Sequence, residues 1–151
     1  LGKYLCLPDE TLYKIQMGGM LHDIGKLGVS LEILGKRDKL TADEIETLKR
    51  HVEIGIKIVS SIHNLEMVAP VIASIYERWD GAGYPNGLKG EKIPIESRVI
   101  SVVNTYLAMR IDRAYRKGVA DSTAIEELLK NRGKQFDPQI IDAFLQIQRQ
   151  R

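Results

Sequence analysis

A histidine and an aspartate, His22 and Asp23, stand side by side in the apolar run GGMLHDIGKLG at residues 18–28. An imidazole nitrogen and an anionic oxygen together suit a divalent metal ion. Adjacent residues of an α-helix point about 100° apart, so both can face one pocket only at a helix end or edge. Taken alone, the pair is more typical of a capped helix end, where His22 would lie near the negative pole of the helix dipole.

The two remaining histidines have different surroundings. His51 falls between Leu48 and Val52 in angle on the apolar face of a predicted helix, so it should point toward the core. A lone histidine there is more often a hydrogen-bonded core residue than a metal ligand. His63 stands at a predicted helix end and should lie on the surface.

Helices must position these side chains, because the apolar residues recur with helical spacing and no β-hairpin pattern occurs. The chain is therefore predicted to be all-α. The first helix should begin with Asp9 as its N-cap and carry His22 and Asp23 at its C-terminal end. Gly25 can stop it.

Two further helices should follow. Residues 41–62 should form one of them, because Thr41 and Glu44 match a capping box. Residues 65–79 should form the next, with Pro70 tolerated in its first turn.

The only long irregular stretch is DGAGYPNGLKGEKIP at residues 80–94. It holds four of the 13 glycines and two of the five prolines, which predicts a turn-rich loop. Long ordered loops are often functional. Helical spacing then resumes at residues 95–110. The last helices should begin with a capping box at Thr123 and Glu126 and with Asp137 as an N-cap.

Composition limits the class of protein. The 151 residues fit one domain, 1–151, with 44% hydrophobic and 28% charged residues. A net charge of +2 gives no case for a partner that is a nucleic-acid polymer, and no apolar run is long enough for a membrane segment. Cys6 is the only cysteine and should be a small buried residue, which fits a cytoplasmic location. A first residue other than Met suggests a fragment of a longer signalling protein.

Several motifs together closely resemble the HD-GYP family of the HD phosphohydrolase superfamily. They are His22-Asp23-x-Gly25-Lys26, LT before the helix that bears His51, and ERWDGAGYPNGLKGEKIP at residues 77–94. The part from Trp79 to Pro94, the GYP loop, matches almost residue for residue. DRAYR at 112–116 and GKQFDP at 133–138 are also similar. The resemblance implies an HD-domain-like helical bundle with a long GYP loop.

Active members of this family are cyclic di-GMP phosphodiesterases with two or three metals, often iron or manganese. By resemblance, His22 would ligate one metal, Asp23 would bridge two, and His51 would ligate the second. Lys26 would be the catalytic residue beside the reacting phosphate. Arg113 and Arg116 would bind phosphate, and the family's GYP loop is a proposed surface for GGDEF-type partners. The residues at that surface would be Trp79, Asp80, Gly81, Gly83, Tyr84 and Pro85.

Three ligand positions of the family pattern are replaced. Ile75 and Tyr76 stand where the family has two histidines, and Asn104 stands where it has an aspartate. Isoleucine has no lone pair, a tyrosine has a reference pKa of about 10, and an asparagine offers only a neutral oxygen. A further family aspartate, not counted as a ligand, is replaced by Leu107. The family's upstream histidine would fall before Leu1.

These replacements leave two main hypotheses. The first is a degenerate domain of bacterial cyclic di-GMP signalling that acts as a binding or regulatory module with little or no hydrolysis. The second is a metal-dependent phosphodiesterase with a reduced site, in which His22, Asp23 and His51 hold iron or manganese. Under the first, there need be no cofactor. A homodimer is one way to cover an apolar seam left by a missing upstream element.

A third hypothesis keeps ligand binding without turnover. Arg113, Arg116 and Lys117 would then hold the phosphates by charge alone. A solvated basic surface explains the same three residues equally well.

Overall fold

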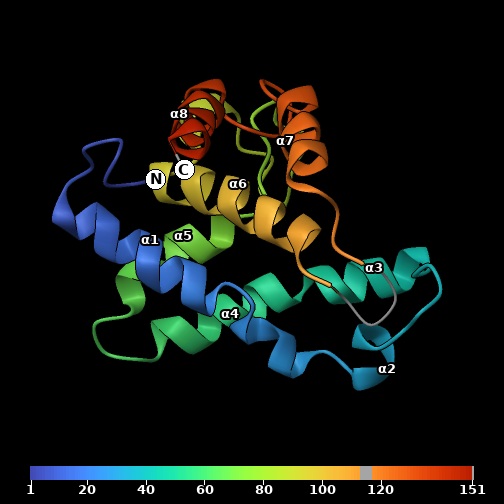
Figure 1. Ribbon diagram of the computed structural model, residues 1–151. Helices are drawn as coiled ribbons and strands as arrows, with labels where there is room; N and C mark the ends of the chain where they lie inside the picture. The colour runs from blue at the N-terminus through green and yellow to red at the C-terminus, as the bar shows by residue number, and fades with distance from the viewer. Residues whose placement is uncertain (113–116, 151) are drawn as a thin grey trace.

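The computed structural model describes residues 1–112 and 117–150, and the chain in these ranges is helical, with a single isolated bridge between Arg132 and Phe136 and no strand. Figure 1 shows the arrangement of the helices. The all-α prediction is confirmed. The α-helices are α1 (Asp9–Leu21), α2 (Leu31–Leu34), α3 (Ala42–Lys49), α4 (His51–Ser60), α5 (Ala69–Ser74), α6 (Ile95–Arg110), α7 (Asp121–Lys130) and α8 (Pro138–Arg149). The 3-10 helices are η1 (Ile24–Gly28), η2 (Glu66–Val68) and η3 (Gly90–Lys92).

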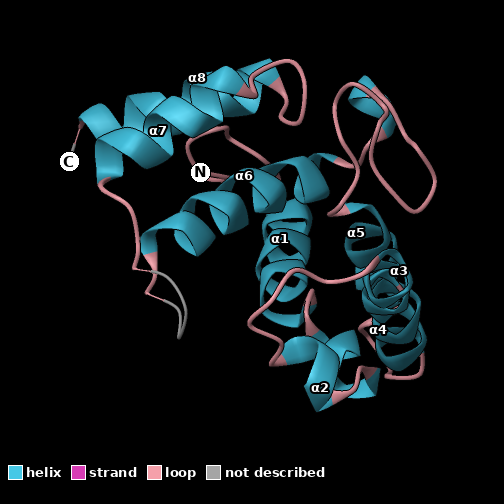
Figure 2. Ribbon diagram, turned by 90° about the vertical axis from the view of Figure 1, so that its right-hand side faces the viewer, coloured by secondary structure: helices cyan, strands magenta, loops and turns pink. Residues whose placement is uncertain are grey.

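Helix α6 runs through the middle of the bundle. Helices α7 and α8 pack on one side of it, and α1 and α5 pack on the other, with α4 beyond α5 (Figure 2). Two hydrophobic clusters follow from this arrangement. One lies between α6, α7 and α8, and the other joins α4, η2 and α5. The residues at their centres are Val102, Leu128, Ile140 and Ile141 in the first, and Val59, Val68 and Ile72 in the second.

Two of the predicted helices are shorter in the structure. The helix expected over residues 41–62 divides at Arg50, whose N–H bonds the carbonyl of Thr47 in 3-10 fashion. The helix expected over residues 65–79 is helical in the α form only from Ala69 to Ser74. It ends early because the following residues leave the helix axis to enter the GYP loop, so that Tyr84 N–H can bond the carbonyl of Tyr76.

The helix starts were predicted with mixed success. The capping box at Thr41 and the N-cap at Asp137 are confirmed, because their side-chain oxygens accept backbone N–H groups. The N-cap of α1 is Pro8, one residue before the predicted Asp9. The capping box predicted at Thr123 is wrong, because α7 already begins at Asp121.

Cys6 is exposed at a positive φ of 52°, so the prediction that it is buried is wrong. Arg113 and Arg116, the predicted phosphate-binding residues, lie outside the described residues. In the described part of the chain, no helix is both long and apolar enough to cross a membrane.

Candidate metal centre and the GYP loop

The end of α1 places His22 and Asp23. His22 is the C-cap residue of α1, and its backbone N–H bonds the carbonyl of Gly18. Its ring Nδ1 lies 2.8 Å from the carbonyl oxygen of Gly19. A carbonyl only accepts, so Nδ1 carries the hydrogen and Nε2 is directed elsewhere. That Nε2 lies 3.5 Å from Asp23 Oδ1.

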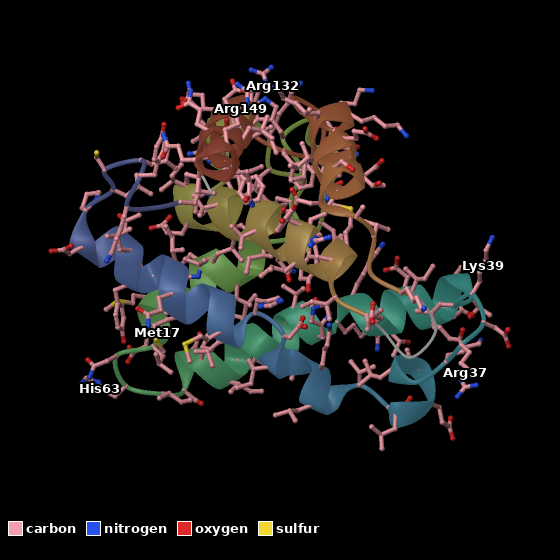
Figure 3. All side chains as sticks on the ribbon, viewed as in Figure 1. Met17, Arg37, Lys39, His63, Arg132 and Arg149 are labelled. Atoms are coloured by element: carbon pink, nitrogen blue, oxygen red, sulfur yellow. The ribbon has the colours of Figure 1, made fainter. Side chains whose placement is uncertain are left out.

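His51, at the start of α4, is oriented like His22, with its Nδ1 against a backbone carbonyl oxygen. Its Nδ1 donates to the carbonyl oxygen of Leu48 at 2.5 Å, and its side chain is 2% exposed, as its place on the apolar face predicts. The third histidine, His63, is at the outer edge of the molecule, where its side chain is 90% exposed (Figure 3). His63 therefore has no part in the site, which was also predicted.

Gly25 holds the two parts of the site together. It lies in η1, where the backbone crosses α4 so closely that a Cβ atom would come within 1.8 Å of the His51 carbonyl oxygen and 2.5 Å of the Gly55 nitrogen. Gly25 was predicted to stop α1, but α1 ends earlier, at Leu21. The glycine is needed for the close backbone contact, which brings Asp23 near His51.

The Tyr76 hydroxyl lies between the two halves of the predicted metal site. It donates to Asp23 Oδ1 at 3.2 Å, and its oxygen is 3.1 Å from His51 Nε2. Its ring meets His51 edge to face, with ring centroids 5.2 Å apart. Burial, and then the negative charge of Asp23, raise the pKa of Tyr76 far above its usual value of 10. Tyr76 is therefore a neutral phenol that joins Asp23 and His51 through hydrogen bonds.

Both oxygens of Asp23 have partners. Oδ1 accepts from Tyr76, and Oδ2 accepts from Lys26 Nζ at 2.7 Å. Burial raises the pKa of Asp23, but the hydrogen bond from Lys26 and the nearby positive charges outweigh it and hold that pKa below its usual value. Asp23 is thus an anion whose charge is offset by a lysine side chain.

This donor set does not fit the two-metal centre that the resemblance implies. Among the described residues, no group of three or more His, Cys, Asp or Glu side chains is arranged to hold a metal. Ile75 is buried against the core and offers no donor. Asn104 lines two cavities, one together with Tyr76 and the other together with His22, and it carries no charge to offset two close cations.

The GYP loop is fixed by a buried carboxylate that the sequence analysis did not single out. Glu77 is 3% exposed, and its two oxygens accept the backbone N–H groups of Asn86 and Leu88 at 2.7 and 3.0 Å. The sequence signal that could have indicated this role is the position of an acidic residue just before a glycine-rich loop. The predicted partner residues lie together on this loop, and Tyr84 stacks on Tyr76 with 5.2 Å between ring centroids.

The loop is also tied to neighbouring elements. Trp79 N–H bonds the carbonyl of Gln135, and Asp80 N–H bonds that of Lys134, in the segment before α8. Lys49 Nζ lies 5.2 Å from the centroid of the Tyr84 ring. The loop is therefore a built part of the bundle that joins the metal-site residues to the C-terminal helices.

Known proteins are similar in sequence to this chain. The profile of the family described as "HD domain" matches residues 1–140. The cyclic di-GMP phosphodiesterase response regulator RpfG of Xanthomonas campestris pv. campestris is 37% identical over 147 residues, which are 96% of this chain and 39% of that protein. The cyclic di-GMP phosphodiesterase of Thermotoga maritima is 37% identical over 146 residues, 95% of this chain and 40% of that protein. The chain thus spans about two-fifths of the length of these relatives.

Solved structures share its fold. The cyclic GMP-AMP specific phosphodiesterase V-cGAP3 of Vibrio cholerae has a TM-score of 0.71 and 22% identity, over 97% of this chain and 40% of that one. Bd1817, an HDGYP protein of Bdellovibrio bacteriovorus, has a TM-score of 0.72 and 20% identity, over 98% and 47%. The names of the curated relatives favour the predicted alternative, a metal-dependent phosphodiesterase, over a regulatory module.

Proposed function

This chain belongs to the HD domain family, and on that premise we propose that it binds a cyclic dinucleotide such as cyclic di-GMP as a signalling module and hydrolyses it little or not at all. The relatives' names support the ligand. The observation that carries the second part is the Tyr76 hydroxyl, which joins Asp23 to His51 where the family pattern has a metal ion.

Hydrogen bonds at this place compete with metal binding. A cation between Asp23 and His51 would have to displace the Tyr76 O–H, and a neutral phenol is a poor ligand. A second cation would also be poorly bound, because Asn104 is neutral where the family pattern has a negatively charged aspartate. Like charges a few ångströms apart repel strongly unless carboxylates offset them. The hydrogen bonds of the Tyr76 hydroxyl therefore hold Asp23 and His51 in position without a metal ion.

The remaining parts of the proposal concern partners. Arg113 and Arg116 would hold the phosphates of the ligand, and the GYP loop would face a GGDEF-type signalling protein in the cytoplasm. The loop supports this role because protein groups hold its shape: the Glu77 carboxylate accepts two loop N–H groups, and Trp79 and Asp80 bond the segment before α8. It would therefore keep a constant surface in a domain without a metal.

A second candidate function is a metal-dependent phosphodiesterase with a reduced site. It is favoured by the relatives' names and by the two histidines, since both use Nδ1 to bond a carbonyl. This orientation is common in histidines that bind metal through Nε2. Iron or manganese would then be held by His22, Asp23 and His51, with Lys26 beside the phosphate.

Metal analysis of three purified proteins separates the two candidates: the wild-type chain, the His22→Ala variant, and a variant carrying Ile75→His, Tyr76→His and Asn104→Asp. After incubation with Mn²⁺ or Fe²⁺ and removal of free metal, we expect little metal in the first two and a clear rise in the third. Stoichiometric metal in the wild type, lost in His22→Ala, would support the phosphodiesterase. Unchanged metal content in the triple variant, with its helical spectrum intact, would contradict the family alignment of these three positions.

A further inference from the structure

A cavity of about 420 Å³ lies between α6, the GYP loop and the segment before α8. Its size is within the range of small-molecule sites, about 300–1,000 Å³. We propose that this cavity is a nucleobase subsite, in which Asn104 and Gln135 bond the edge of a base. The inference deepens the proposed function and rests on it for the identity of the base, which would be a guanine of the cyclic dinucleotide.

The charged side chains in the cavity wall already have hydrogen-bond or ion-pair partners within the protein. The two carboxylate oxygens of Glu77 accept hydrogen bonds from two backbone N–H groups of the GYP loop. Arg78 forms a two-pronged ion pair with Asp80, at 3.1 and 2.8 Å. No cation among the described lining residues is left to bind a phosphate, so the cavity suits a neutral ligand.

The polar groups that remain are neutral. Ser101, Asn104 and Thr105 are spaced i, i+3 and i+4, so they share one face of α6, and Gln135 lines the same cavity. Within the described residues, these four side chains have no hydrogen-bond partner. Two amides and two hydroxyls can both donate and accept, which matches the mixed donor and acceptor edge of a nucleobase.

Aromatic rings complete the wall. The stacked pair of Tyr76 and Tyr84 lines the cavity beside Gly83 and Ala82. Flat, weakly polar walls of this kind favour a planar ring system. Asn104 thus has a use of its own: the residue that cannot offset a metal's charge supplies an amide for base recognition.

Two fragments of the ligand test the subsite directly. Guanosine carries the base without a phosphate, and ribose 5-phosphate carries the phosphate without the base. In titrations followed by the backbone amide signals of the protein, we expect guanosine to shift the signals of Gly83 and Ser101 in a saturable way. Ribose 5-phosphate should leave those signals unchanged. Shifts of those signals by ribose 5-phosphate and not by guanosine would overturn the proposal.

Two shape-conserving variants test the residues, with cyclic di-GMP as the probe in calorimetry. Asn104→Leu and Gln135→Met should each weaken binding about tenfold, because each removes a hydrogen-bonding amide. Gln139→Met is the matched control, since Gln139 is exposed on α8 and does not line the cavity. It should bind like the wild type. If either cavity variant fails to fold, the other serves, because the two lie on different elements.

The outcomes separate this inference from the proposed function. Tight cyclic di-GMP binding that neither cavity variant weakens would overturn the subsite and leave the proposed function standing. Saturable guanosine binding at Gly83 and Ser101, without binding of cyclic di-GMP, would support the subsite and overturn the proposed ligand.

Discussion

Tyr76 is the residue on which the site depends most. Its hydroxyl bonds two groups that stand 28 positions apart in the sequence: Asp23, just before η1, and His51, at the start of α4. Removing that one oxygen would leave a buried ring nitrogen without a partner. A buried polar group left unsatisfied costs roughly 1–3 kcal/mol.

Tyr76→Phe should therefore lower the free energy of unfolding by an amount in that range, measured by urea denaturation. The matched control is Tyr13→Phe, on the outer face of α1, where the ring is 42% exposed. That change should have little effect. Equal stability of the two variants would mean that the Tyr76 hydroxyl does not hold the site together.

The buried tyrosines should also make the stability of the protein depend on pH in the alkaline range. Burial first, with the charges of Asp23 and Glu46, raises the pKa of Tyr84 to about 12. The unfolded chain loses that proton near pH 10, so above this pH the folded state binds more protons than the unfolded state. Stability should then fall as pH rises from about 10 to about 12.

The measurement is the thermal midpoint across this pH range for the wild type and for Tyr84→Phe. The variant should show a shallower fall, because one of the tyrosines with a raised pKa is gone. The same slope in both proteins would count against the buried environment of Tyr84.

At the scale of elements, the contact between η1 and α4 positions the site. Gly25→Ala would drive a Cβ atom into the backbone of α4, and overpacking of this kind costs about 1–3 kcal/mol. Gly19→Ala, in the preceding helix α1, is the matched control, since nothing lies within 4 Å of its added Cβ. Alanine is the better helix former by roughly 0.5–1 kcal/mol, so Gly19→Ala should be neutral or stabilising.

Unfolding free energies of the two glycine variants check this prediction. If Gly25→Ala is as stable as Gly19→Ala, the close approach of η1 to α4 is wrong, and so is the explanation of how Asp23 reaches His51.

Local signals predicted some elements and missed others for a physical reason. The capping box at Thr41 and Glu44 was predictable because all of its hydrogen bonds lie within four residues. The end of α5 at Ser74 was not, because it depends on bonds between the GYP loop and distant segments, such as that from Trp79 to Gln135. The role of Gly25 was missed for the same reason, since its neighbours belong to α4.

At the scale of the whole molecule, a buried ion pair joins the central helix α6 to the start of α8. Arg98 of α6 donates to Asp137, the N-cap of α8, at 2.7 Å, and the Asp137 side chain is 1% exposed. Arg98→Met would leave that carboxylate buried without its partner. Breaking a buried pair in this way costs about 3–5 kcal/mol.

Thermal unfolding of Arg98→Met should show that loss as a large drop in midpoint. Arg132→Met is the matched control, because the pair between Arg132 and Asp142 is exposed on both sides and should matter little. Similar midpoints for the two variants would contradict a buried link between α6 and α8.

The candidate site could be predicted in part from the sequence. The motifs predicted one site for His22, Asp23, His51 and Lys26. In the structure, Asp23 lies 3.5 Å from His22 Nε2 and 2.7 Å from Lys26 Nζ. The base-sized cavity was not predicted, because α6 and Gln135 meet only in the folded chain. The polar face of Ser101, Asn104 and Thr105 was the one signal for it in the sequence.

We propose that hydrogen bonds through Tyr76 take the place of the metals, so that this chain would bind its ligand without efficient turnover. The most direct measurement is the rate of cyclic di-GMP hydrolysis by the purified chain with Mn²⁺ or Fe²⁺, followed by chromatography beside the His22→Ala variant. We expect no more product from the wild type than from His22→Ala. Turnover by the wild type that the His22→Ala change abolishes would contradict it.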